Sequence, residues 1–320
     1  MIKITENRVD SSICMRDAYC NAIVDMARED PTIVSVEADV VSSMGMEPFR
    51  AEFPDRDINC GIQEANAVGV AAGLSLSGFK PTFNAFATFA SRRVFDQVFV
   101  SCAYNDANVK IFAGDAGVTS GANGATHMAC EDLGIMSTVP GMMVIEPADT
   151  VAMYKIVRKA FEIYGNAYIR SARKIVTNVY DDETDFEIGK ANVLRDGTDV
   201  TIVACGIMVD AALKAADMLE KEGISAAVID CFTIKPLDEE TVCGYAKKTG
   251  AVVTAENHNI FGGLGSSVAL AISRNCPVPV ENIAVMDVIG EDGEVPFLRE
   301  KYHLMPEDVA AAAKKAISRK

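Results

Sequence analysis

Glu64 is the residue whose neighbours most clearly indicate chemistry. It lies in the run Gly61-Ile62-Gln63-Glu64-Ala65-Asn66-Ala67-Val68-Gly69-Val70-Ala71-Ala72-Gly73-Leu74, whose small and apolar residues predict a packed helix. Three phenylalanines follow at every third residue, Phe83, Phe86 and Phe89. A lone carboxylate beside flat apolar side chains could bind one edge of an aminopyrimidine ring while a phenylalanine stacks on its face.

Thiamine diphosphate contains such a ring, and its thiazolium carbon must lose a proton to become a nucleophile. A carboxylate that hydrogen-bonds the pyrimidine N1′ favours the imino tautomer that removes this proton. We therefore predict thiamine diphosphate chemistry at Glu64. Two plainer interpretations stay open: Glu64 could serve only its helix dipole, and the phenylalanines could be a core stripe at helical spacing.

Two glycine-rich loops follow predicted strands, where α/β proteins usually bind ligands. The loop at 114–127 ends in His127, a candidate for a polar or catalytic role, although lone histidines are more often capped or exposed. The loop at 256–265 contains Gly262-Gly263-Leu264-Gly265. Its glycines could bind phosphate, or they could form a structural turn against the other domain or a partner.

Short β-branched runs alternate with longer helical stretches, which predicts an α/β fold with parallel sheets. The acidic, aperiodic segment 180–185 is predicted to be a linker. We thus expect two doubly wound domains, residues 1–180 and 186–320. The predicted strands are 32–36, 109–112, 142–145, 167–170, 200–204, 226–229, 251–254 and 283–288. The predicted helices are 16–28, 65–76, 92–104, 150–164, 209–222, 262–273 and 307–318.

Composition excludes several classes of protein. The chain has 320 residues and a formal net charge of −15, which argues against a nucleic-acid partner. Its nine cysteines include no C-x-x-C pair, so reduced thiols are expected. We see no signal peptide and no uncharged apolar stretch long enough to span a membrane. A cytoplasmic location without membrane contact is predicted.

Several short motifs, taken in order, resemble the transketolase family, and the resemblance covers nearly the whole chain. It is strongest to the separate C-terminal subunit of split transketolases, and the first domain also resembles deoxyxylulose-phosphate synthase. The motifs are Met15-Arg16-Asp17-Ala18, Val36-Glu37-Ala38-Asp39, the Glu64 run, Phe95-Asp96-Gln97-Val98, Gly124-Ala125-Thr126-His127, Glu131-Asp132-Leu133, Glu256-Asn257-His258-Asn259 and Gly262-Gly263-Leu264-Gly265.

The resemblance implies a pyrimidine-binding domain followed by a transketolase C-terminal domain. Glu64 matches the activating glutamate and Phe86 the stacking aromatic, with Phe83 and Phe89 beside it. Asp39 matches a residue near the cofactor at the subunit contact, and His127 a substrate-site histidine. Positions that hold the sugar phosphate are matched by Arg16, Ser43 and Arg170, and guanidinium groups suit a phosphate.

The chain departs from the family at three positions. Many transketolases have a histidine where Gly114 stands and an aspartate where Asn123 stands. Ala125 replaces a usual proline. These departures leave the identity of the sugar open.

The chain lacks the Gly-Asp-Gly motif with which thiamine enzymes hold Mg²⁺ and the diphosphate; Glu291-Asp292-Gly293 is a poor imitation. We therefore expect no metal ligands here. The resemblance implies a separate N-terminal subunit that binds Mg²⁺ and the diphosphate, in an assembly of two copies of each chain.

The leading hypothesis is the C-terminal subunit of a transketolase of the pentose phosphate pathway type. It would transfer a two-carbon ketol unit from a ketose phosphate to an aldose phosphate, with Glu64 and His127 as catalytic residues. The alternatives are the β-subunit of a 2-oxo-acid dehydrogenase, half of a deoxyxylulose-phosphate-synthase-like enzyme, and a non-catalytic subunit that only completes a dimer.

Overall fold

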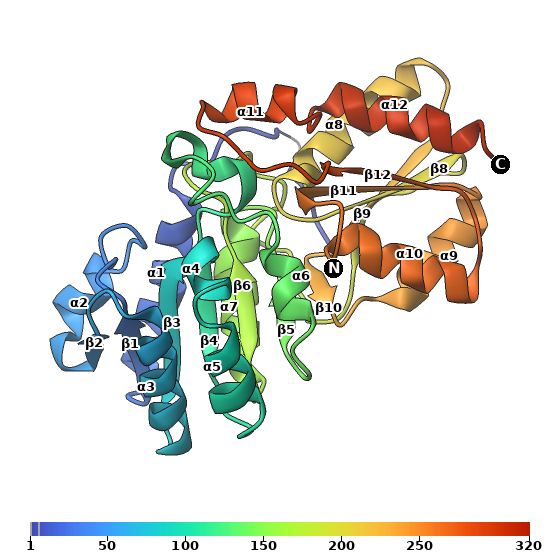
Figure 1. Ribbon diagram of the computed structural model, residues 1–320. Helices are drawn as coiled ribbons and strands as arrows, with labels where there is room; N and C mark the ends of the chain where they lie inside the picture. Colours follow the sequence, from blue (N-terminus) through green and yellow to red (C-terminus); the bar gives the residue numbers. More distant parts are fainter. Residues whose placement is uncertain (1, 6) are drawn as a thin grey trace.

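Two mostly parallel β-sheets form the framework of the computed structural model, which describes residues 2–5 and 7–320 (Figure 1). The first sheet has seven strands in the order β10-β5-β6-β4-β3-β1-β2. Six of them come from the first half of the chain and are parallel. Their bounds are β1 Ile33–Glu37, β2 Asp57–Asn59, β3 Lys80–Phe86, β4 Lys110–Gly114, β5 Met143–Ile145 and β6 Ala167–Arg170.

The second sheet has five strands in the order β12-β11-β8-β9-β7. Strand β7, at one edge, runs antiparallel to its neighbour. The bounds are β7 Asn192–Arg195, β8 Val200–Ala204, β9 Ala226–Asp230, β11 Val252–Asn259 and β12 Val280–Val285. The remaining strand, β10 (Thr233–Lys235), leaves this half and pairs antiparallel with β5 of the first sheet.

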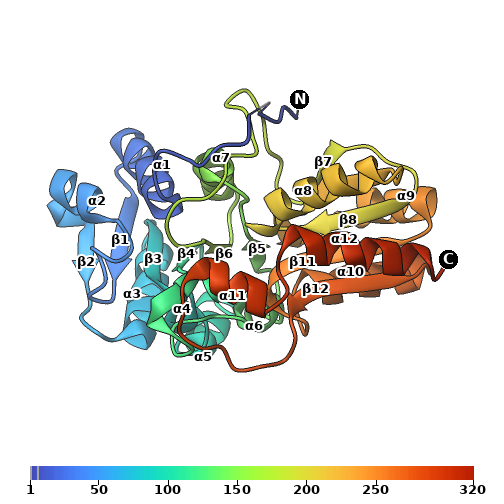
Figure 2. The same cartoon turned by 90° about the horizontal axis from the view of Figure 1, so that it is seen from above.

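Helices cover both faces of each sheet, which confirms the predicted pair of doubly wound α/β units (Figure 2). In the first unit α1 and α7 contact each other on one face, and α3 lies against β3 and the π-helix η2 on the other. The bounds here are α1 Met15–Glu29, α2 Glu47–Glu52, η1 Pro54–Arg56, α3 Glu64–Leu76, α4 Ala87–Ser91, α5 Phe95–Gln97, η2 Val98–Ala103, η3 Gly117–Asn123, α6 Asp132–Ser137 and α7 Thr150–Glu162.

In the second unit α8 contacts α12, and α9 contacts α10. The bounds are α8 Met208–Lys221, α9 Glu239–Thr249, α10 Leu264–Asn275, α11 Val295–Lys301 and α12 Pro306–Ile317. Helix α11 reaches back to η3 of the first unit. Because both hydrophobic clusters also contain residues from both units, the halves share one continuous interior.

The predicted linker, residues 180–185, is packed against the rest of the protein. Tyr180 and Thr184 are buried, and Phe186 follows in the core. The Tyr180 hydroxyl donates to Asp230 at 2.6 Å, so the segment is attached to the second sheet. The four acidic residues of the segment are exposed: Asp181, Asp182, Glu183 and Asp185. The domain limits of 180 and 186 stay a prediction.

The predicted helix at 92–104 is wrong in its form. Residues 92–94 are a turn, and the helical part begins with α5 and continues as the six-residue η2. The predicted strand at 283–288 begins earlier, at Val280, and ends at Val285.

All nine cysteines are free thiols; seven are buried, and Cys14 and Cys60 are half-buried. In the part of the chain that the structure describes, no helix has the length and apolarity to cross a bilayer.

Candidate functional site

The site lies where the parallel strands of the first sheet end. Asp39 comes just after β1, and Glu64 is reached through the loop that leaves β2. Phe86 is the last residue of β3, and Asp115 follows β4. Since carboxyl ends of parallel strands share one edge of a sheet, residues far apart in sequence gather there.

Glu64 is the first residue of α3 and is only 6% exposed. Its Oε1 accepts a hydrogen bond from Nη1 of Arg93 at 2.7 Å. The Arg93 guanidinium lies 3.8 Å from the centre of the Phe89 ring and stacks over it. The sequence analysis missed Arg93, because the turn that brings residues 92–94 to α3 was predicted to be a helix.

A cavity of about 440 Å³ lies beside this ion pair. The open space borders Arg93, and Glu64 lies behind its arginine partner without lining the cavity itself. The lining residues come from α4, from the turn that follows it and from the end of the glycine-rich loop: Thr88, Phe89, Arg92, Arg93, Thr126 and His127.

His127 meets two of the predicted aromatic residues at this cavity. Its ring lies edge-on to Phe86, with 5.3 Å between centres, and edge-on to Phe89 at 5.2 Å. Its Nδ1 is 2.9 Å from the hydroxyl oxygen of Thr126. Partial burial, with the nearby arginines, lowers the pKa of His127 below its usual value. The imidazole is therefore neutral at neutral pH.

Phe83 does not share this surface. It lies inside β3, is fully buried and belongs to the core on the α3 side of the sheet. The three-residue spacing is not helical: Phe83 and Phe86 belong to a strand, and Phe89 to the helix α4 that begins at Ala87. The core interpretation thus describes Phe83, whereas Phe86 and Phe89 face His127.

A second cluster is cationic and surrounds Asp115. Arg16 donates to the backbone carbonyl of Ser43 at 2.6 Å, so two predicted phosphate residues do lie together. Arg173 pairs with Asp115 at 3.2 Å. Burial raises the pKa of Asp115 to about 6, against the opposing effect of Arg173, Arg16 and Lys174. Arg16 also lies 3.8 Å from Asp17, so three cations face two carboxylates, and the surplus of one suits a further anion.

Arg170 does not fit the predicted phosphate role. Its side chain is fully buried, and Nε donates to Asp132 at 2.8 Å while Nη1 donates to Glu146 at 2.6 Å. Nη2 donates to the backbone carbonyls of Ala129 and Asn257. The guanidinium is saturated within the fold and joins the two units. Arg173, three residues further along, has a side chain that is 32% exposed.

Asp39 is exposed at the end of β1, with a positive φ of 62°. Its Oδ1 accepts from Asn59 Nδ2 at 3.2 Å, and its N–H donates to Asn59 Oδ1 at 3.1 Å. Among the described residues, no hydrogen bond or ion pair joins Asp39 to Glu64 or to the residues lining the cavity. Its predicted place near a cofactor remains a prediction.

The side chain of Met44 lies beside Gly114. Gly114 pairs with Phe86 across β3 and β4. A Cβ at this position would lie 2.8 Å from Sδ of Met44, which is buried. A thioether therefore occupies the space that a side chain at 114 would need.

The second glycine-rich loop is structural. The carboxylate of Glu256 accepts the N–H groups of Leu264 and Gly265 at 2.8 and 2.7 Å, which occupies the start of α10 where a phosphate would bind. Gly262 lies against Gly134 of the first unit. The interpretation as a turn against the other domain is the one that fits.

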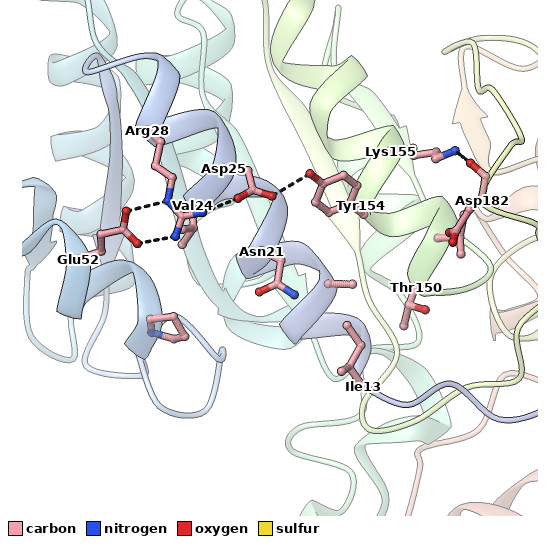
Figure 3. Close-up of a pocket in the computed structure, with 13 residues that line it drawn as sticks. Ile13, Asn21, Val24, Asp25, Arg28, Glu52, Thr150, Tyr154, Lys155 and Asp182 are labelled. Atoms are coloured by element: carbon pink, nitrogen blue, oxygen red, sulfur yellow. Dashed lines mark hydrogen bonds and ion pairs between the residues drawn. The ribbon is translucent and has the colours of Figure 1, made fainter.

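A pocket of about 570 Å³ lies between α1 and α7 (Figure 3). Asp25 is at its centre and accepts from Arg28 and Tyr154, both at 2.8 Å. None of the predicted site residues lines this pocket, so it is separate from the site around Glu64.

A pyrimidine ring fits the first cluster in chemical terms: a buried carboxylate, phenylalanine rings and an adjoining cavity. The described residues contain no group of three or more His, Cys, Asp or Glu that could hold a metal ion.

Two family models match the chain: "Transketolase, pyrimidine binding domain" over residues 11–178 and "Transketolase, C-terminal domain" over residues 189–309. A 6-deoxy-6-sulfo-D-fructose transketolase subunit from a Clostridium species is 43% identical over 306 residues, covering 96% of this chain and 95% of the relative. An apulose-4-phosphate transketolase subunit of Phocaeicola vulgatus is 40% identical over 279 residues, covering 87% and 89%.

Two solved structures of transketolases are also similar to this chain. One described as a split gene transketolase, inactive β4 tetramer, superposes with a TM-score of 0.89 at 46% identity and covers 97% of this chain and 100% of that one. The transketolase of Leishmania mexicana shares the fold, with a TM-score of 0.82 at 20% identity; it is matched over 47% of its length and 99% of this chain. The chain is thus a member of the transketolase family and is similar over most of its length to separate subunits of split transketolases.

Proposed function

We propose that this chain is the C-terminal subunit of a thiamine-diphosphate-dependent transketolase that transfers a two-carbon ketol unit between sugars with an anionic end. The observation that carries the proposal is the buried carboxylate of Glu64 beside a cavity lined by Phe89 and His127. The similarity to separate transketolase subunits supports it.

When bound, thiamine diphosphate would supply the nucleophilic carbon that cleaves and forms the C–C bond. In this chain Glu64 would accept a hydrogen bond from the pyrimidine N1′. Phe86 and Phe89 would hold the ring by stacking and edge contacts. The burial of Glu64 keeps water from competing for its carboxylate, which strengthens such a bond.

His127 is suited to receive or donate a proton at a substrate oxygen, because it is neutral and half-exposed at the cavity. Arg16, Ser43 and Arg173 would bind the anionic end of the sugar. Arg173 also lines a cavity of about 340 Å³ with Lys174 and Arg299, and the two aspartates of that lining, Asp10 and Asp210, leave a surplus of one positive charge there. Asp39 would lie near the cofactor at the contact between subunits.

The anionic end of the sugar is open to two chemistries. One relative is named for a sulfonated fructose and another for apulose 4-phosphate. Sulfonate and phosphate both present oxygens to guanidinium groups, so the Arg16–Arg173 cluster suits either. We propose a ketose with one of these groups as donor and an aldose phosphate as acceptor.

A partner chain would complete the enzyme. The sequence contains no Gly-Asp-Gly motif, so Mg²⁺ and the diphosphate would be held by a separate N-terminal subunit. Two copies of each chain would place the pyrimidine of thiamine diphosphate on this subunit and its diphosphate on the other.

The test is reconstitution with the co-purifying N-terminal subunit, thiamine diphosphate and Mg²⁺, followed by a screen of phosphorylated and sulfonated ketoses. Glu64→Gln should lower kcat by about 10²-fold or more, because the variant lacks the carboxylate charge that favours protonation of N1′. Glu47→Gln is the matched control, since Glu47 also begins a helix but is exposed. Unchanged activity of the Glu64 variant would instead support a subunit that only completes a dimer.

A further inference from the structure

Arg93 occupies the position that a pyrimidine edge would take at Glu64. We propose that Arg93 is a positioning residue: it holds the carboxylate of Glu64 oriented before the cofactor binds and then gives it up to the ring of the cofactor. This inference depends on the proposed function, because it assumes that the ligand of Glu64 is an aminopyrimidine.

The guanidinium of Arg93 resembles a protonated pyrimidine in shape and charge. A guanidinium is planar and cationic and donates N–H bonds in its own plane. Arg93 uses both properties here: Nη1 donates to Glu64 Oε1 at 2.7 Å, and the plane lies 3.8 Å from the centre of the Phe89 ring. A pyrimidine protonated at N1′ would make the same two contacts, one N–H to the carboxylate and one face to an aromatic ring.

Arg93 lies between the cavity and the carboxylate of Glu64. Phe89 and Arg93 both line the cavity beside Glu64, so the guanidinium stands between the open space and the carboxylate. A ring that entered from the cavity and donated to Oε1 from the same side would take the place of the guanidinium. Binding of the cofactor from that side therefore requires Arg93 to leave.

The side chain of Arg93 can move more easily than that of Glu64. The side chain of Arg93 is 49% exposed, whereas that of Glu64 is 8% exposed. The arginine can therefore move into water at small cost, whereas the carboxylate stays in place.

The ion pair with Arg93 stabilises the buried carboxylate of Glu64 before the cofactor binds. A buried carboxylate without a partner is costly, and its side chain would rotate or be displaced to find one. Arg93 supplies that partner until the cofactor binds. The cost is that each cofactor molecule must displace an ion pair, so Arg93 weakens cofactor binding while it keeps the acceptor in position.

The experiment measures the apparent Kd of thiamine diphosphate for the reconstituted complex by calorimetry, without substrate. Arg93→Gln should tighten binding by about two- to fivefold, the range expected for loss of a half-exposed ion pair. Arg93→Lys retains the charge and should stay near the wild-type value. Arg28→Gln is the matched control: Arg28 is 54% exposed and pairs with Glu52 outside this cavity, and its loss should not tighten binding.

A second readout uses the isolated chain. Arg93→Gln should lower its melting temperature, whereas the same change made on a Glu64→Gln background should have a smaller effect, because the ion pair is already broken. Weaker or unchanged cofactor binding by Arg93→Gln would overturn the proposal. If Glu64→Gln is inactive in that case, the proposed function stands and only the role of Arg93 fails; a fully active Glu64 variant would remove both.

Discussion

At the scale of single residues, burial decided which predicted residues can act. Glu64, Phe86, Phe89 and His127 could be predicted, because a lone acid, ring side chains and a loop histidine carry their chemistry in their type. Arg170 could not be distinguished from Arg173 by type. The first is enclosed at the end of β6 and the second is half-exposed after it, and only the three-dimensional fold separates them.

Glu37 gives a pH-dependent prediction at the same scale. It is fully buried in β1, and its Oε1 accepts from Ser35 at 2.7 Å and Asn84 at 3.0 Å. Burial raises the pKa of Glu37 to about 8, with a further upward effect from Asp57. In the unfolded chain its pKa is about 4.3.

Because the folded state holds this proton more tightly, Glu37 contributes stability that is complete below pH about 4 and is lost as pH rises to about 8. Glu37→Gln should remove this slope. Urea midpoints measured between pH 5 and 8 should therefore fall less steeply for the variant than for the wild type. Parallel curves would show that Glu37 is already ionised in the folded protein.

At the scale of elements, the alternation of β-branched runs and helical stretches predicted most strands and helices of both sheets. This prediction failed where the local sequence pattern does not determine the path of the chain. The turn at 92–94 and the π-helix η2 have helical composition, and only packing against α3 fixes their path. The short strand β10 crosses to the other sheet, a pairing that no local signal encodes.

Gly262 tests the contact between elements of the two units. Its φ is +84°, and a Cβ there would lie 2.9 Å from Cα of Gly134 in α6. Gly262→Ala should therefore destabilise the protein by about 1–3 kcal/mol. Gly244→Ala is the control: it lies in α9 with nothing near its Cβ, and alanine there should stabilise by about 0.5–1 kcal/mol. Urea unfolding of both variants measures these changes, and equal effects would contradict the assigned contact.

At the scale of the whole molecule, Arg170 of the first unit forms two buried ion pairs inside that unit and one hydrogen bond to the second. Arg170 joins Asp132 and Glu146 and also reaches the backbone of Asn257 in β11. Arg170→Gln would leave two buried carboxylates without their cation. The free energy of unfolding should fall by about 3–5 kcal/mol.

Chemical denaturation measures this loss, with Arg170→Lys as a second variant that retains the charge and should lose less. An Arg170→Gln protein with wild-type stability and a raised KM for the sugar would instead restore the predicted phosphate role. Arg173→Gln provides the comparison, because we expect it to raise KM with little loss of stability.

The central claim is that Glu64 accepts a hydrogen bond from the pyrimidine of thiamine diphosphate and so promotes loss of the C2 proton. The most direct measurement is the rate at which this proton exchanges with deuterium in the reconstituted complex, followed by NMR after acid quench. We predict rapid exchange in the wild type and a rate about 10²- to 10⁴-fold lower in Glu64→Gln. Equal rates in a Glu64→Gln complex that binds the cofactor normally would contradict the account.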